Sequence, residues 1–124
     1  MNPVLAIKYF LLGPSSTKNA NEITANTPDN TTITTRNKSQ YTYVPLTPQE
    51  ERNNTVQFFV RPGAELTFKR GVAGYYDEDR KFRNTDGFVT HYLIEGVFTN
   101  SDNQDSSMSL YVPRNVVERE FVIK

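Results

Sequence analysis

The chain has 124 residues, a length typical of one domain. Lys+Arg and Asp+Glu both number 14, and this zero net charge argues against a general polyanion-binding domain, whose surface is usually basic. The absence of cysteine excludes disulfides, thiolate metal sites and cysteine nucleophiles, and the single histidine, His91, excludes any site that needs two.

The first 13 residues form an apolar segment with one cation, Lys8, inside it. A secretory signal carries its positive charge before the apolar stretch, and a membrane span needs about 20 apolar residues. The segment is therefore predicted as a first β-strand. We expect a protein made in the cytoplasm, with no signal peptide and no membrane partner.

Residues 13–40 are polar, and Ile23 and Ile33 are their only large aliphatic side chains. So little apolar surface does not offset the entropy of ordering a long segment. We predict a polar arm or long loop that is mobile in the free monomer and orders by adding a strand to the sheet edge of a neighbour. β-Branched residues favour extended chain, so the candidate interaction residues are Thr31, Thr32, Ile33, Thr34 and Thr35.

Local signals place a short strand at 41–44 and one short helix near 48–53. Thr47 is a capping residue, Pro48 suits the first helical position, and Glu50 completes a capping box. Residues 56–60 and 64–69 alternate as strands around Pro62-Gly63, a tight-turn dipeptide. We predict that these two strands form a β-hairpin.

The second half predicts further strands. Residues 71–74, with two glycines, indicate a bend at which the chain leaves the sheet. Residues 88–99 form the longest strand candidate, with Phe88, Tyr92, Ile94 and Phe98 on one face, and both of its faces are partly apolar, as in a central strand. Two more strands are predicted at 108–112 and 116–123, with a turn or bulge at 113–115, because proline cannot donate within a central ladder.

These segments predict one all-β domain over residues 1–124. The architecture is a small sandwich or barrel of six to eight short antiparallel strands. The 15 Phe and Tyr residues, with no Trp, suit the core of such a fold.

Cations alternate with aromatic residues between positions 61 and 83. On a small barrel this pattern holds single-stranded nucleic acid, through stacking and phosphate pairing. Acidic residues in the same stretch cancel most of the positive field, so a solvated loop or a protein interface is the preferred interpretation. The candidate interaction residues of this stretch are Tyr75, Tyr76, Arg80, Lys81 and Arg83.

No catalytic, cofactor-binding or metal-binding residue is predicted. The carboxylate runs at 77–79 and 102–105 lack the spacing, central glycine and distal glutamate of a calcium loop. Asp and Asn side chains that bond their own backbone in turns explain both runs better. His91 lies within a predicted strand, without a nucleophile motif or a second histidine to support a catalytic role.

We therefore expect a non-enzymatic structural or interaction protein. The preferred hypothesis is an accessory subunit of a large assembly, such as a decoration, cement or connector protein of a phage virion. Its partners would be proteins, a second copy of the chain included, and no cofactor is expected. Two alternatives stay open, an OB-like barrel that binds single-stranded nucleic acid and a small subunit of a host protein complex.

Overall fold

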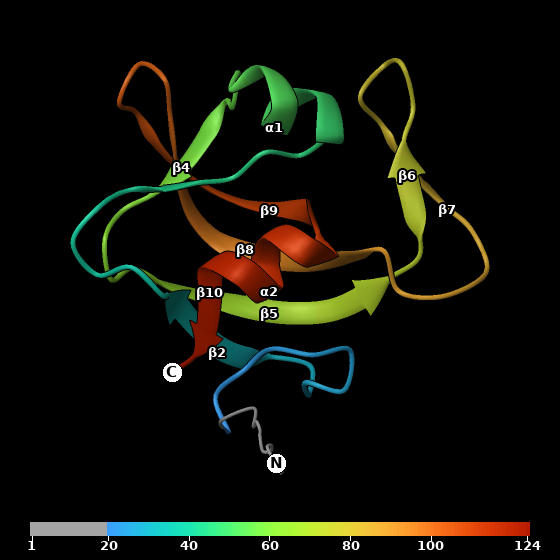
Figure 1. Cartoon of the computed structure of the whole chain (residues 1–124), viewed down its shortest axis with the longest axis horizontal. Helices are drawn as coiled ribbons and strands as arrows, with labels where there is room; N and C mark the ends of the chain where they lie inside the picture. The colour runs from blue at the N-terminus through green and yellow to red at the C-terminus, as the bar shows by residue number, and fades with distance from the viewer. Residues whose placement is uncertain (1–19) are drawn as a thin grey trace, which may run out of the picture.

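A computed structural model describes residues 20–124, so the strand predicted within residues 1–13 lies outside the described residues. Residues 20–124 form a seven-stranded sheet and a separate two-stranded sheet, and every strand pairing is antiparallel (Figure 1). The all-β fold class is confirmed. In chain order the elements are β2 (Thr31–Thr35), β3 (Thr42–Tyr43), α1 (Pro48–Asn53), β4 (Phe58–Val60), β5 (Glu65–Val72), β6 (Gly74–Tyr76), β7 (Phe82–Asn84), β8 (His91–Asn100), β9 (Asp105–Pro113), α2 (Arg114–Glu120) and β10 (Phe121–Ile123).

The predicted helix at 48–53 is confirmed as α1. Thr47 is the N-cap, as predicted, because its side chain accepts a hydrogen bond from the Glu50 backbone N–H at 3.1 Å. The Glu50 half of the predicted capping box differs, since its carboxylate accepts from the Leu46 N–H and not from the Thr47 N–H. No helix within residues 20–124 is long and apolar enough to cross a membrane.

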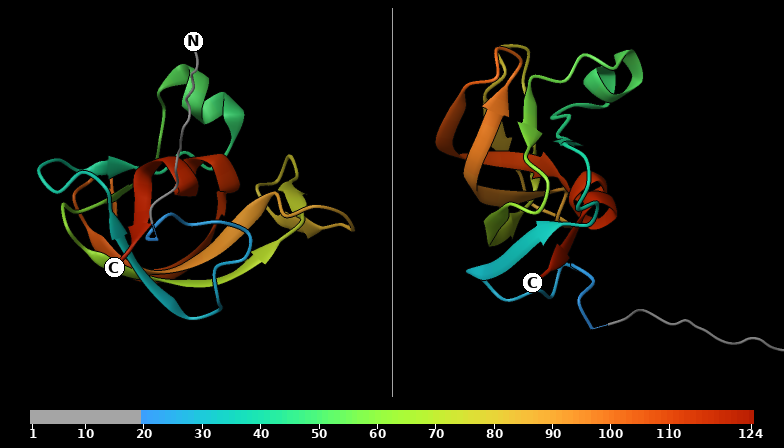
Figure 2. Two further views of the ribbon diagram at one scale, coloured as in Figure 1. Left: turned by 60° about the horizontal axis from the view of Figure 1, so that its bottom comes forward. Right: turned by 90° about the vertical axis from the view of Figure 1, so that its left-hand side faces the viewer.

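The large sheet is organised around β8. β9 pairs with one edge of β8 from His91 to Thr99, while β5 and then β4 pair with the other edge. β2 and β10 continue the sheet beyond β5, and β3 continues it beyond β4. Figure 2 shows that the sheet curls around α2 and forms a half-barrel.

The turn at Pro62-Gly63 is confirmed, but the predicted hairpin is wrong. The Ala64 N–H donates to the Arg61 carbonyl at 3.1 Å, and Gly63 has a φ of +73°. β4 and β5 do not pair with each other, because the ten-residue β8 has room for both on one edge. Their aromatic side chains then meet different core residues of β8, with Phe58 packing against Phe98 and Phe68 against Tyr92.

Within residues 20–40, the part of the predicted polar arm or long loop that the structure describes, the prediction is wrong for residues 31–35, which form β2, while residues 20–30 and 36–40 contain no helix or strand. β2 lies between β10 and β5, so both of its edges are already paired and it cannot be added to the sheet of a neighbour. Ile33 is 0% exposed at the centre of the core. The threonines fit because sheet pairing satisfies their backbone and local partners satisfy their hydroxyls. Thr34 donates to the Ala64 carbonyl, and Thr35 accepts from the Gly63 N–H, both at 2.8 Å.

The predicted strand at 116–123 is also wrong over most of its length. Residues 114–120 form α2, which begins where a turn or bulge was predicted, and only Phe121–Ile123 form a strand. Valine favours strands by local propensity, but burial of Val116 and Val117 beneath the curled sheet overrides this preference. Glu118 adds a polar anchor, because it accepts hydrogen bonds from Tyr92 of β8 and from Arg114.

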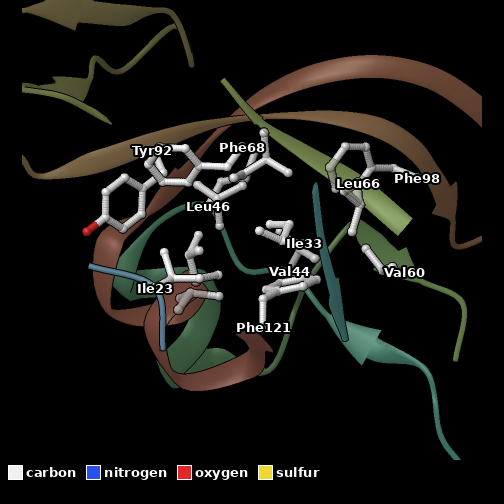
Figure 3. Close-up of a cluster of buried hydrophobic side chains, with 14 residues drawn as sticks. Ile23, Ile33, Val44, Leu46, Val60, Leu66, Phe68, Tyr92, Phe98 and Phe121 are labelled. Carbon is white, nitrogen blue, oxygen red and sulfur yellow. The ribbon is translucent and has the colours of Figure 1, made fainter. Parts of the chain in front are cut away.

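The core lies inside the curl of the sheet (Figure 3). Three of the four residues predicted on the core face of the longest strand, Tyr92, Ile94 and Phe98, are buried there. The fourth, Phe88, is 93% exposed, because β8 begins only at His91 and Phe88 precedes it in a loop. Figure 3 shows Ile33 in the middle of this cluster, which also includes Ile23 and Phe121.

The corrected position of β2 yields a stability prediction. Replacing Ile33 with Ala should lower the free energy of unfolding by about 2–5 kcal/mol, because the side chain is fully buried. Replacing its exposed neighbour Thr32 with Ala should change it by less than about 0.5 kcal/mol. Chemical denaturation measures the free energy of unfolding of both variants. Equal stability of the two variants would contradict the burial of Ile33 and would indicate that residues 31–35 form a peripheral arm.

Candidate interaction surface

A two-stranded ribbon, β6–β7, projects from one end of the half-barrel (Figure 1). The predicted bend at 71–74 is confirmed, because β5 ends at Val72 and β6 begins at Gly74. The Gly74 N–H donates to the Thr90 hydroxyl at 2.9 Å, which ties the bend to the residue just before β8. A Cβ at Gly74 would lie 2.3 Å from the Arg83 carbonyl oxygen, so the close approach of the two ribbon strands requires glycine.

Aromatic packing fixes the ribbon to the sheet. The Phe82 ring stacks on Tyr111 of β9 at 4.2 Å and meets His91 of β8 at 4.8 Å, nearly edge-on. The Tyr76 hydroxyl donates to the Tyr111 carbonyl, and its ring contacts Phe82 and His91. Four rings from four strands therefore hold the ribbon in one orientation.

Burial in this aromatic contact shifts two titratable groups. Desolvation lowers the pKa of His91, because a charged imidazolium is disfavoured between the rings. Desolvation also raises the pKa of Tyr76, so its phenol stays neutral and keeps its proton for the Tyr111 carbonyl. The Nδ1 of His91 lies 2.7 Å from the Thr90 hydroxyl. A neutral His91 held in this way is a packing residue of the ribbon.

The carboxylate run at the ribbon tip forms a turn, as the sequence predicts. Asp77 Oδ1 accepts from the backbone N–H groups of Asp79 and Lys81, both at 2.9 Å. Its other oxygen accepts from Arg83 at 2.7 Å. The Lys81 amide, followed by Arg83 and the Asp79 amide, holds the pKa of Asp77 below its usual value. Asp77 is therefore a structural residue.

A turn with the same hydrogen-bond pattern joins β8 to β9. Each of the two turns contains one residue with a positive φ, so the residue types at that position can be compared. Asn103 has a φ of +63° in the β8–β9 turn, and Arg80 has a φ of +62° at the ribbon tip. Asn tolerates this left-handed conformation, whereas Arg rarely adopts it. The Arg80 side chain forms an ion pair with the buried carboxylate of Glu50 in α1. Glu50 also accepts from the Leu46 N–H at 3.0 Å, so this ion pair joins the ribbon tip to α1.

The structure separates the two groups of predicted interaction residues. Thr31, Thr32, Ile33, Thr34 and Thr35 lie within the large sheet, away from the ribbon (Figure 1). The other five gather on the ribbon but differ in their roles. Tyr76 faces the sheet, while Arg80 and Arg83 are paired with Glu50 and Asp77. Tyr75 is 54% exposed. Lys81 is also exposed, and no carboxylate within residues 20–124 pairs with it.

Sequence reasoning missed Phe88, the most exposed aromatic residue within residues 20–124. It lies in the loop between β7 and β8, directly after Gly87, whose φ is +127°. The Asp86-Gly87 dipeptide is a turn signal directly before Phe88, but it does not show that β8 begins only at His91. Phe88 and Tyr75 thus belong to one projecting segment, residues 73–90, named here the β6–β7 lobe.

Within residues 20–124, no three His, Asp or Glu side chains gather into a group that could hold a metal ion. Comparison with known proteins finds no matching family model, no similar curated protein and no matching solved structure.

The lowered pKa of His91 predicts how acid affects the fold. The unfolded chain binds a proton near pH 6.5 and the folded chain only at lower pH, so stability is full above about pH 6.5 and falls as the pH decreases through that value. The melting temperature should drop between about pH 7.5 and pH 5.5, and His91→Gln should remove this drop. NMR titration of the single imidazole reports its pKa directly. A His91 pKa at or above 6.5 would contradict the burial described here.

Proposed function

We propose that the protein is a non-enzymatic structural or interaction subunit of a larger protein assembly, and that it binds its partner through the β6–β7 lobe. The observation that carries this proposal is Phe88, a large apolar ring that is 93% exposed in the β7–β8 loop of the projecting lobe. A second exposed aromatic residue, Tyr75, lies on the same lobe. Aromatic residues are enriched at the energetic centres of protein interfaces and depleted from surfaces without partners.

The anchoring of the lobe supports this proposal. A mobile loop loses conformational entropy when it docks, whereas an ordered surface loses little. Stacking of Phe82 on Tyr111 and the Arg80–Glu50 ion pair order the lobe before any partner arrives. Phe88 is thus presented on a scaffold that is already held in place.

Two kinds of assembly fit this proposal. One is a virion, in which the chain would act as a decoration, cement or connector subunit of a phage particle. The other is a protein complex of a host cell, in which the chain would be a small subunit. The small all-β architecture suits both, and the identity of the proteins captured from the source organism separates them.

Phe88→Ser tests the proposed contact. The exposed ring contributes little to the fold, so the melting temperature should stay near that of the wild type. Binding to the partner should weaken by more than about tenfold, because a central aromatic residue carries about 2 kcal/mol or more of binding energy. Affinity capture from source lysate, with light scattering to detect self-association, measures this loss.

Val97→Ser is the matched control. Val97 is an exposed apolar residue of β8, outside the lobe, so this variant should capture the same proteins as the wild type. Equal capture by Phe88→Ser and the wild type would remove the lobe from the interface.

Single-stranded nucleic acid, the alternative partner, needs a basic face. On the lobe, carboxylates neutralise Arg80 and Arg83 and leave Lys81 as the exposed cation. We therefore predict no binding of a single-stranded oligonucleotide in a gel shift at physiological salt. Tight, salt-sensitive binding that is lost when Arg80, Lys81 and Arg83 are changed to Glu would favour the nucleic-acid function instead.

A further inference from the structure

A shallow depression of about 250 Å³ lies on the outer face of the large sheet, where β3 and β4 meet the turn between β8 and β9. Three aromatic residues, Tyr41, Tyr43 and Phe59, line one side of it. Hydroxyl and amide side chains from residues 99–103 line the other side. Figure 1 shows β4 and the β8–β9 turn at the opposite end of the molecule from the β6–β7 lobe, so the two surfaces are separate.

Sheet register explains why these aromatic residues share the outer face. Thr42 pairs with Val60, and both side chains are buried in the core. The next pair, Tyr43 and Phe59, must then point outward, because side chains alternate across a strand. Phe59 in turn pairs with Thr99 of β8, which continues the row toward the β8–β9 turn.

The aromatic rings are held in place before any ligand binds. Tyr43 and Phe59 meet edge-to-face at 5.1 Å. Arg61 lies over the Tyr41 ring at 5.6 Å and donates to its hydroxyl at 2.6 Å. Even so, Tyr43 is 54% exposed and Tyr41 is 43% exposed, so both keep surface for a ligand.

The depression carries no net charge. Every residue that lines it is neutral, and Arg61, the cation that contacts the lining residue Tyr41, forms a two-point ion pair with Asp105 at 3.0 and 3.2 Å. The Arg61 guanidinium also keeps Asp105 ionised by lowering its pKa. A phosphate or sulfate group would therefore find no uncompensated positive charge here.

Two polar side chains, those of Ser101 and Asn103, line the depression together with the aromatic rings. The turn uses the Asn100 side chain for its own backbone, since Asn100 Oδ1 accepts from the N–H groups of Asp102 and Gln104. Neither Ser101 nor the Asn103 side chain is hydrogen-bonded to any residue in 20–124, and both line the depression. One hydroxyl and one amide are thus available to a ligand that also covers the aromatic rings.

We infer that this depression, lined by Tyr41, Tyr43, Phe59, Ser101 and Asn103, binds a neutral saccharide. A sugar ring presents a face of C–H groups, which packs on an aromatic ring, and a rim of hydroxyls, which bond to amide and hydroxyl side chains. Ordinary ligand pockets begin at roughly 300 Å³, so this smaller depression suits one sugar unit of a longer glycan. This site is independent of the protein contact proposed for the β6–β7 lobe.

NMR titration of the full chain, labelled with ¹⁵N, tests the inference. The probes are three neutral oligosaccharides at millimolar concentration, maltotriose, cellotriose and chitotriose, with a heparin oligosaccharide and an oligothymidylate as charged comparisons. At least one neutral probe should shift the backbone amides of residues 99–103. The two charged probes should leave these amides unchanged.

Two tyrosines with the same exposure provide the variant and its control. Tyr43→Ala should weaken saccharide binding by about tenfold or more, which is the order of effect when one stacking aromatic residue is removed. Tyr75→Ala, on the β6–β7 lobe, removes an equally exposed ring and should leave the affinity unchanged. Tyr43→Phe keeps the ring, so it should retain binding even if Tyr43→Ala disturbs β3.

Three results would overturn the inference. In the first, none of the neutral oligosaccharides shifts residues 99–103. In the second, Tyr43→Ala and Tyr75→Ala weaken binding equally. In the third, the heparin oligosaccharide or the oligothymidylate, and no neutral probe, shifts these amides, which would assign the surface to an anionic ligand.

Discussion

The whole structure depends on β8, which pairs with other strands along both edges and packs its inner face into the core. β9 occupies one edge, β5 and β4 share the other, and the core-facing side chains contact both helix α2 and the inner strands. Tyr92, Ile94 and Phe98 are buried on its inner face, whereas Glu95 and Val97 on its outer face are exposed. Tyr92 connects this strand to α2 through Glu118, so the helix inside the curl is held by packing and by a hydrogen bond.

The half-barrel positions both candidate surfaces as a consequence. The ribbon β6–β7 leaves β5 at the bend and packs back on the start of β8 and the end of β9, through Phe82, His91 and Tyr111. The aromatic residues of β3 and β4 lie at the other end of β8, beside the turn into β9. Each surface is anchored to one end of the same central strand, so both are ordered without a partner.

The two surfaces differ in chemistry, which is why they suit different ligands. The lobe carries an exposed apolar ring, Phe88, in its β7–β8 loop, and exposed aromatic rings are the usual anchors of protein interfaces. The depression beside Tyr43 combines aromatic rings with amide and hydroxyl groups, and the cation that contacts it, Arg61, is paired with Asp105. A protein that joins an assembly by one end and contacts a glycan with the other would use both.

Features that depend on neighbouring residues were predictable from the sequence. The Thr47 cap of α1, the Pro62-Gly63 turn, the bend before Gly74 and the Asp77 turn each follow from the bonding or φ preference of a few adjacent residues. The core face of β8 was predictable for the same reason, since alternation is a local property of a strand.

Tertiary structure alone decided the rest, because the deciding partners are distant in the chain. β8 offers one edge to both β4 and β5, which prevents their hairpin. The sequence predicted a polar arm at the Thr-rich run 31–35. Pairing of this run with β10 on one edge and β5 on the other makes it part of the sheet and of the core. Val116 and Val117 favour strands locally, but their burial inside the curled sheet places them in helix α2. Local propensity amounts to tenths of a kcal/mol per residue, whereas burial of a large side chain contributes about 1.5–3 kcal/mol, so long-range packing determined the outcome wherever the two disagreed.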